Sequence, residues 1–298
     1  MSASTRPAER DARAVLAAAC DQVGLDSRDA TLVQAVDNSV FRLARTPAFI
    51  KVMTNPFLAH RARNSVAAAR LLAAAGVPAV RPLFDVPNPV FVDECSVSFW
   101  HEEPGSTASP SGGELARRLA QLHRLPTTSP VLLDWDPVAA LRSRIGGADA
   151  AEPSDIDFLT RRCDEIEAEL AELSYELPTA VIHGDAHPGN LIMTPAGSLL
   201  CDLDTVAIGP QEWDLVPVAV RQLRFAPRTG WHSEMVAAYG VDVTEWDGFP
   251  VLRDLRELDL AAAALRMARR DPLAGLEFRK RLRTLRTARV DERWDVQR

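Results

Sequence analysis

The hydrophobic periodicity changes along the chain, and this change limits the possible folds more than any other feature of the sequence. Between residues 30 and 53, apolar and polar residues alternate, with many β-branched side chains and with interruptions at "DNS" and "TP". Such alternation indicates half-buried strands joined by tight turns, so we predict three short antiparallel strands. Apolar residues have helical spacing over 8–22 and 57–75, and further strands are predicted near 81–85, 89–92 and 95–100. Together these elements form a unit with one sheet and a long helix.

Beyond this unit the sequence is mainly helical. The stretch "HEEPGSTASPSGG" is rich in Gly, Pro and Ser, which indicates a connection. Helices are predicted from the apolar spacing over 114–125, 155–173 and 251–270. Between the second and third of them lies a compact β region, with strands near 179–182, 191–193 and 199–203. We therefore predict an α+β fold with two domains, one over residues 1–102 and one over residues 103–298.

The composition limits the compartment and the partners. A net charge of -7, from 34 basic and 41 acidic residues, argues against nucleic acid, whose phosphates favour a basic surface. No apolar run approaches the ~20 residues of a membrane span, and the charged N-terminal stretch has no signal-peptide core. The cysteines form no CxxC pair, which favours reduced, structural thiols. We expect a cytoplasmic protein with neither a nucleic-acid nor a membrane partner.

Lysine is almost absent from the chain. Only Lys51 and Lys280 are lysines among the 34 basic residues. Lys51 lies between Ile50 and Val52 in a short apolar stretch, where a buried ammonium needs an anionic partner. Alternatively, its amine reaches solvent from the edge of a strand. The sequence leaves both interpretations open.

The polar loop "VIHGDAHPGNLI" at 181–192 carries Asp185 and Asn190 between two apolar pairs. If the strands 191–193 and 199–203 pair across "TPAGS", Asn190 comes close to Asp202. Amide and carboxylate oxygens suit a hard cation such as Mg²⁺, and Asp185 is then placed to accept a hydroxyl proton. Metal ligands, a lysine for the phosphates and an aspartate base are the parts that phosphoryl transfer uses.

The motifs "HGDAHPGN", "LLCDLD" and "GPQEWDL" resemble those of the aminoglycoside phosphotransferase family, relatives of choline and homoserine kinases. The similarity extends from about residue 30 to about residue 265. It implies a bilobal, protein-kinase-like fold, with a small N-terminal antiparallel-sheet lobe that covers the nucleotide and a larger, mainly helical C-terminal lobe with the catalytic loop, metal site and acceptor site. It also implies ATP as co-substrate, Mg²⁺ as cofactor and a small-molecule hydroxyl acceptor.

The resemblance assigns a role to individual residues. Asp185 is implied as the catalytic base, with Asn190 and Asp202 as Mg²⁺ ligands and Asp204 as an assisting carboxylate. Lys51 is implied to bind the α- and β-phosphates. Further nucleotide contacts are implied at three places. Asn38 and Ser39 would lie at the tip of the hairpin, Trp100 and His101 at the hinge between the lobes, and Ile192 and Cys201 under the base.

One departure from the family pattern affects Lys51. Kinases of this fold pair that lysine with a glutamate on the long N-lobe helix, but the helix over 57–75 has no acidic residue, and Asn64 or Ser65 falls near the expected position. Either another group orients Lys51, for instance a carboxylate from the second lobe, or nucleotide binding is weakened. A degenerate kinase-fold binding protein is therefore an alternative function.

The two loop histidines allow a second alternative. His183 is predicted to hold the loop backbone, His187 is left open, and Asp214 is predicted to N-cap the following helix. A metal-dependent hydrolase using His183, Asp185 and His187 as ligands would give Lys51 and Asn190 no task.

The acceptor site has the weakest sequence signal. The carboxylates of Asp254, Glu257 and Asp259 on the helix over 251–270 would suit an amine-bearing acceptor such as an aminoglycoside. They would equally suit ion pairs with neighbouring arginines. The sequence does not predict an oligomeric state.

Overall fold

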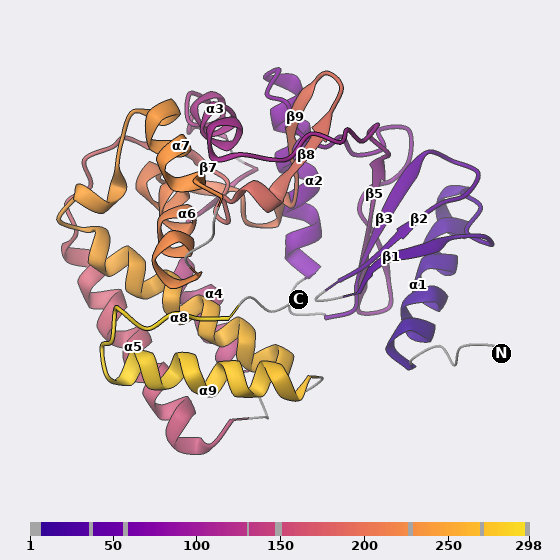
Figure 1. The fold of residues 1–298 in the computed structure, drawn as a ribbon. Helices are drawn as coiled ribbons and strands as arrows, with labels where there is room; N and C mark the ends of the chain where they lie inside the picture. Colours follow the sequence, from indigo (N-terminus) through magenta and orange to yellow (C-terminus); the bar gives the residue numbers. More distant parts are fainter. Residues whose placement is uncertain are drawn as a thin grey trace. The chain divides into compact units, whose positions relative to one another are not determined.

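The computed structural model describes residues 7–35, 38–55, 59–129, 131–146, 151–225, 229–268 and 271–295. The chain divides into two compact units (Figure 1). The first comprises Met1–Pro110, Thr128–Leu133 and Gly189–Val206, and the second comprises Ser111–Thr127, Asp134–Pro188 and Ala207–Arg298. Residues 189–206, which the sequence-based division assigned to the C-terminal domain, thus pack with the N-terminal unit.

A five-stranded antiparallel sheet forms the centre of the first unit. Its order is β1 (Thr31–Ala35), β2 (Ser39–Arg42), β3 (Ala48–Met53), β5 (Cys95–His101) and β4 (Val90–Val92). The three strands predicted between residues 30 and 53 are confirmed. The strand predicted at 81–85 is wrong, because Pro82 makes only an isolated bridge to Trp100 there. A proline has no N–H to donate to a ladder, so it limits strand pairing.

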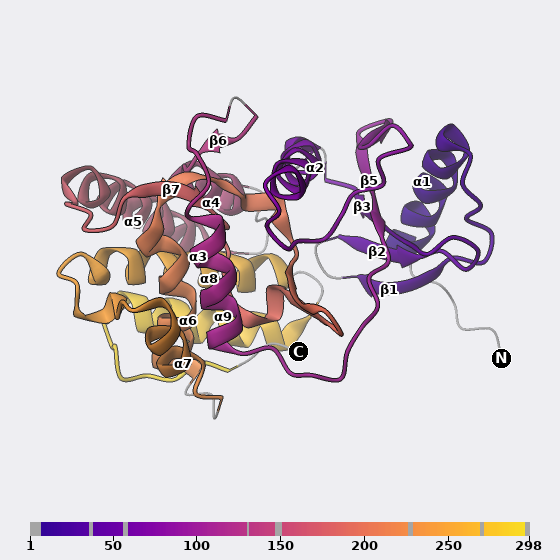
Figure 2. The same ribbon diagram turned by 90° about the horizontal axis from the view of Figure 1, so that it is seen from above.

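Helices α1 (Pro7–Val23) and α2 (Ala59–Ala74) lie on opposite faces of this sheet, as Figures 1 and 2 show. On the α1 side, Leu16 packs into a core with Ile50 and Val52 of β3, all 2% exposed or less. Each fully buried side chain of this kind contributes about 1.5–3 kcal/mol. Because side chains alternate along a strand, Lys51 projects from the other face of the sheet. The first two residues of the predicted helix, 57–58, lie outside the described residues.

A hairpin of β8 (Leu191–Thr194) and β9 (Gly197–Leu200) also belongs to the first unit. It confirms the predicted pairing across "TPAGS", although β9 lies earlier than the predicted 199–203. Asp202 follows it in the left-handed conformation, with φ 56°, and a 3₁₀ turn, η3, covers Leu203–Thr205. The change of backbone conformation at Asp202 therefore ends the extended segment.

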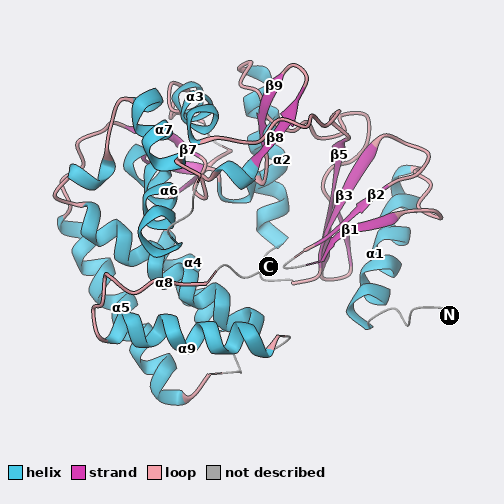
Figure 3. Ribbon diagram, viewed as in Figure 1, coloured by secondary structure: helices cyan, strands magenta, loops and turns pink. Residues whose placement is uncertain are grey.

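The second unit is mainly helical (Figure 3). Its helices are α3 (Gly112–Leu122), α4 (Pro137–Gly146), α5 (Pro153–Glu172), α6 (Gln211–Phe225), α7 (Trp231–Tyr239), α8 (Phe249–Ala268) and α9 (Pro272–Arg286). A small sheet has the order β6 (Leu133–Asp134), β10 (Ala207–Pro210) and β7 (Thr179–Ile182), and 3₁₀ turns lie at Pro188–Asn190 (η2, in the loop between the units) and Val243–Glu245 (η4). Residues 269–270 of the predicted last helix lie outside the described part.

Helix α8 is the central helix of this unit, because it packs against α4, α5, α6 and α9. Its buried positions include Leu252, Leu255 and Leu258, at most 1% exposed. The spacing of its apolar residues is the reason that the sequence predicts a helix here. Because neighbouring helices surround it, some of its polar residues face those helices and others face solvent. None of the helices in the described ranges is long and apolar enough to cross a membrane.

Candidate active site

Lys51 lies in a carboxylate cluster of the first unit. Its Nζ is 2.6 Å from Oδ2 of Asp204 and 2.8 Å from Oδ1 of Asp202. The lysine side chain is 15% exposed. Of the two interpretations that the sequence left open, the structure therefore supports the anionic partner and not an amine that reaches solvent.

The charge state of Lys51 follows from these contacts. Burial alone would lower the pKa of the amine, because it disfavours the charged form. The charges and hydrogen bonds of Asp204 and Asp202 outweigh burial and raise the pKa of Lys51 above its usual range. The group is thus an ammonium at neutral pH, as a ligand for phosphate oxygens has to be.

The hairpin brings Asn190 close to Asp202. The backbone N–H of Cys201 donates to the carbonyl oxygen of Asn190 over 3.0 Å, so Asp202 directly follows a residue paired with Asn190. The Asp202 side chain is 49% exposed, whereas Oδ1 of Asp204 is buried and has no hydrogen-bond partner among the residues that the structure describes. Amide and carboxylate oxygens are the donors that Mg²⁺ prefers. Asn190 and Asp202 therefore carry oxygen donors of the kind that a hard cation takes.

The long helix reaches this cluster through Asn64, at the position where a glutamate was missing. The side-chain amide of Asn64 donates to the carbonyl oxygens of Asp204, over 3.1 Å, and of Val206, over 2.9 Å. Asn64 is 8% exposed, and both acceptors flank the turn that carries Asp204. Of the two explanations offered for the missing glutamate, the structure supports another group that orients Lys51.

The other predicted nucleotide contacts also fall in the first unit. Trp100, at the end of β5, is 9% exposed and its Nε1 donates to Oγ of Ser98 over 2.8 Å. Ser39 pairs with Ala35 across the β1–β2 turn, of which residues 36–37 lie outside the described part. The remaining three are Asn38, His101 and Ile192, each partly buried.

Cys201 is the last of the predicted nucleotide contacts. Burial raises the pKa of its thiol to about 12, and the nearby charge of Asp202 adds to this effect. Such a thiol is protonated at neutral pH, which argues against a role as a nucleophile. All four cysteines are free, as the sequence predicted.

Asp185 lies in the second unit, on the loop that follows β7. Asp214 fixes the start of this loop: its Oδ2 accepts from the backbone N–H of His183 over 2.7 Å, and its Oδ1 accepts from that of Gly184 over 2.8 Å. Gly184 has φ 83°, which favours glycine. The predicted N-cap role of Asp214 is wrong, because α6 already begins at Gln211.

Asp214 is held in place by hydrogen bonds with residues that the sequence did not indicate. Nε2 of His123 lies 3.0 Å from Oδ2 of Asp214, and Nδ1 of His123 lies 2.7 Å from the hydroxyl of Tyr239. Trp213 donates from Nε1 to the carbonyl of Gly184 over 2.8 Å. His123 and Tyr239 are far from the loop in sequence and belong to no local motif, so the sequence could not identify them, whereas Trp213 lies in the motif "GPQEWDL".

Arg256, on α8, forms an ion pair with Asp185, with 2.8 Å between Nη2 and Oδ1. Nη1 of Arg256 also lies 3.2 Å from Oδ2 of Asp259, which in turn pairs with Arg144 of α4. Burial would raise the pKa of Asp185, but the positive charge of Arg256, with smaller effects of His187 and His183, lowers it to about 2. Asp185 is therefore ionised throughout the neutral range.

We expect Arg256→Gln to raise the pKa of the Asp185 carboxyl, because burial then acts without its main opposing charge. The lowered value means that the ion pair stabilises the fold above the usual aspartate pKa and loses this effect as the pH falls towards 2. Carboxyl-selective NMR titration of the two proteins measures the shift. Arg253→Gln, which removes a partner of Asp254 instead, is the matched control, and an unchanged titration of Asp185 in Arg256→Gln would contradict the assignment.

The carboxylates predicted for a cationic acceptor are all paired with arginines. Glu257 accepts two hydrogen bonds of 2.6 Å from Arg224, with both side chains 3% exposed. Asp254 lies 3.3 Å from Arg162 and 2.7 Å from Arg253. Asp259 pairs with Arg256 at i−3, as the alternative interpretation foresaw.

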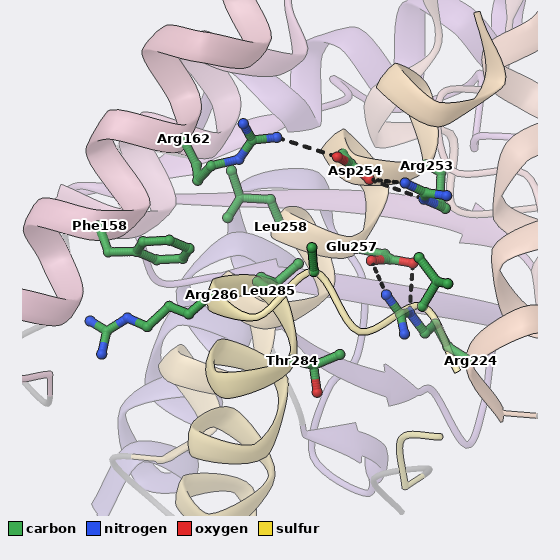
Figure 4. A pocket seen from close by; sticks show the side chains of 12 residues that line it. Phe158, Arg162, Arg224, Arg253, Asp254, Glu257, Leu258, Thr284, Leu285 and Arg286 are labelled. Carbon is green, nitrogen blue, oxygen red and sulfur yellow. Dashed lines mark hydrogen bonds and ion pairs between the residues drawn. The ribbon is translucent and has the colours of Figure 1, made fainter. Parts of the chain in front are cut away.

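Asp254 and Glu257 line a cavity of about 310 Å³ between α5, α8 and α9 (Figure 4). The cavity also exposes Phe158 and Leu258, while Arg162 and Arg224 point to the two carboxylates. Asp185 is not among its lining residues. The contacts therefore favour arginine pairing over acceptor binding for these carboxylates.

The hydrolase alternative finds little support in the geometry. Within the described ranges, no group of three or more His, Cys, Asp or Glu side chains is placed to hold a metal ion. Nε2 of His187 lies 3.9 Å from Oδ2 of Asp185, and burial lowers the pKa of His187. His183 is fully buried, and its Nδ1 faces the backbone N–H of Asp185 at 3.4 Å, as a loop-holding residue would.

An antiparallel sheet with a paired lysine, followed by a helical unit with an aspartate loop, defines the protein-kinase-like α+β fold. The sequence profile of the phosphotransferase enzyme family matches residues 30–260. This match covers most of the chain, and the protein belongs to this family. None of the curated proteins compared with the chain matches it.

Several solved kinase structures are similar to the chain throughout their length. The amicoumacin kinase hAmiN, solved with AMP-PNP, Ca²⁺ and Ami, has a TM-score of 0.72 at 13% identity, covering 97% of this chain and 98% of its own. A choline/ethanolamine kinase family protein from Mesorhizobium loti has a TM-score of 0.63 at 17% identity, covering 94% of both chains. A spectinomycin phosphotransferase, solved with ADP and spectinomycin, has a TM-score of 0.60 at 15% identity, covering 90% and 92%. At these identities the likeness establishes the fold.

Proposed function

We propose that the protein transfers the γ-phosphoryl group of ATP to a hydroxyl group of a small molecule. The observation that carries this proposal is the contact of Lys51 with Asp202, two residues 151 positions apart in the sequence. A lysine held beside a half-exposed carboxylate combines a phosphate ligand with a metal ligand, and phosphoryl transfer needs both. Membership of the phosphotransferase family supports the same reaction.

In this proposal each predicted residue keeps one task. Lys51 binds the nucleotide phosphates, Asn190 and Asp202 hold Mg²⁺, and Asp185 accepts the proton of the attacking hydroxyl. Mg²⁺, when bound, neutralises charge on the phosphates. The adenine contacts are proposed to come from the first-unit residues Asn38, Ser39, Trp100, His101, Ile192 and Cys201. Because ATP is the co-substrate, we place the reaction in the cytoplasm.

The acceptor is proposed as a small hydroxyl compound. Several structural neighbours were solved with such molecules, among them spectinomycin, which makes aminoglycosides and related antibiotics the first compounds to screen. The arginine pairs of Asp254, Glu257 and Asp259 reduce the support for recognition of acceptor amines by these residues. The proposal therefore rests on the hydroxyl and not on a cationic group.

Nucleotide binding is the first property to test. We expect ATP with Mg²⁺ to raise the melting temperature of the protein, since a ligand at about 100 times its Kd stabilises the folded state by about 2.7 kcal/mol. Lys51→Ala and Asp202→Ala should lose most of this shift, and omission of Mg²⁺ should reduce it. Lys280→Ala is the matched control, because it removes the only other lysine, which pairs with Asp295 at 2.9 Å. The absence of any nucleotide-dependent shift in the wild-type protein would favour the degenerate binding protein.

A further inference from the structure

The two carboxylates that contact Lys51 differ in their surroundings. Asp204 is 9% exposed and lies 2.6 Å from the amine, whereas Asp202 is 49% exposed and lies 2.8 Å from it. A buried partner is held in place by the packing around it, while an exposed carboxylate remains accessible to a ligand. The contacts thus divide the two aspartates into a fixed partner and an accessible one.

The turn that carries Asp204 is tied to α2. Asn64 donates to the carbonyl oxygens of Asp204 and Val206, on both sides of Thr205. A side-chain amide that bridges two main-chain carbonyls restrains the backbone of the turn, and with it the direction of the Asp204 side chain. Helix α2 therefore acts on Lys51 indirectly, through the turn.

We propose that Asp204 is the positioning residue for Lys51, that it takes the place of the absent helix glutamate, and that Asn64 holds it there. This inference rests on the proposed nucleotide-binding role of Lys51. It changes the task that the family resemblance suggested for Asp204, which becomes an anchor for the lysine and not a ligand of Mg²⁺. Asp202 and Asn190 remain as the metal ligands.

A double-mutant cycle on nucleotide affinity separates an anchor from a metal ligand. If Asp204 acts through Lys51, Asp204→Asn should weaken ATP binding by roughly tenfold or more, the usual effect of losing a charged hydrogen bond. Adding Asp204→Asn to Lys51→Ala should then weaken binding no further. Raising the Mg²⁺ concentration should not restore the Asp204→Asn protein, although it should partly restore the matched variant Asp202→Asn.

Two outcomes of the cycle would overturn the proposal. One is recovery of Asp204→Asn at high Mg²⁺, and the other is a loss that adds fully to that of Lys51→Ala, since both indicate a role independent of the lysine. Circular dichroism and the melting temperature without nucleotide identify a variant that fails to fold. In that case Asn64→Ala is the variant to test, because it releases the turn but keeps both carboxylates. It should weaken ATP binding as Asp204→Asn does, but by a smaller factor.

A second measurement does not depend on nucleotide binding. The chain has only two lysines, so acetylation by a small amine-reactive reagent can be followed at Lys51 by mass spectrometry, with Lys280 as internal reference. Asp204→Asn should accelerate the reaction of Lys51 several-fold relative to Lys280, and more than Asp202→Asn does. Equal rates in all proteins would refute the anchor. If the wild-type protein binds no nucleotide but the rates differ as expected, the proposed function fails while the anchor stands.

Discussion

Replacement of Asp185 by asparagine is expected to slow phosphoryl transfer by about 10²–10⁴-fold. The carboxylate accepts the proton of the attacking hydroxyl in the transition state, and an amide of nearly the same shape cannot do so. Nucleotide binding should be almost unchanged, because Lys51 and Asp202 belong to the other unit of the chain. The initial rate of ADP formation with an acceptor found by screening gives the first quantity, and an ATP titration gives the second.

The matched control for this variant is Asp164→Asn on α5. Asp164 is 62% exposed and pairs with Arg142 at the surface, so its loss should affect neither rate nor affinity. Turnover of Asp185→Asn at the wild-type rate would remove the assignment of the base. If nucleotide affinity fell by the same factor as the rate, Asp185 would also stabilise the bound nucleotide before the reaction, and not only the transition state.

Glu257→Gln is expected to lower the free energy of unfolding by about 3–5 kcal/mol, the usual effect of breaking a buried ion pair from one side. Glu257 accepts two hydrogen bonds from Arg224, and the two side chains are 3% exposed. The variant leaves the charge of Arg224 buried with a neutral partner. A decrease of the melting temperature on the order of 10 °C would correspond to this loss. Chemical denaturation measures it directly.

Asp254→Asn is the control for Glu257, because it lines the same cavity but is 33% exposed. We expect this variant to lose no more than about 1 kcal/mol. A stable Glu257→Gln protein with a raised KM for the acceptor would contradict our interpretation of the pair. Such a result would support the role in acceptor binding that the sequence suggested for Glu257.

Much of the fold could be predicted because its strands and helices carry a strong periodicity. In β3, Ala48, Ile50 and Val52 are fully buried and alternate with less buried residues, as a one-sided core requires. The strand predicted at 81–85 is wrong because its apolar residues were given more weight than Pro82, whose missing N–H already argues against strand pairing. The end of β9 also differed, since nothing in the residue types indicates that Asp202 takes a left-handed conformation.

The site could be predicted only where its parts are local. Asp185 and Asn190 share one loop, and Asp202 follows the hairpin that begins there, so their grouping was visible in the sequence. The contact of Lys51 with Asp204 spans 153 positions and depends on how the sheet, the hairpin and α2 pack together. Likewise, no periodicity indicates that Asp214 accepts from the loop backbone or that Arg256 pairs with Asp185.

The amide at position 64 adds no charge to the cluster of Lys51, Asp202 and Asp204. When ionised, Lys51, Asp202 and Asp204 together carry one net negative charge. A glutamate in place of Asn64 would add a third carboxylate at the turn that carries Asp204, and like charges close together disfavour ionisation. With asparagine, α2 holds the turn through two carbonyl oxygens and adds no charge. The cluster therefore keeps a single excess negative charge, which a divalent cation would reverse in sign, making the same group of residues attractive to the anionic phosphates of a nucleotide.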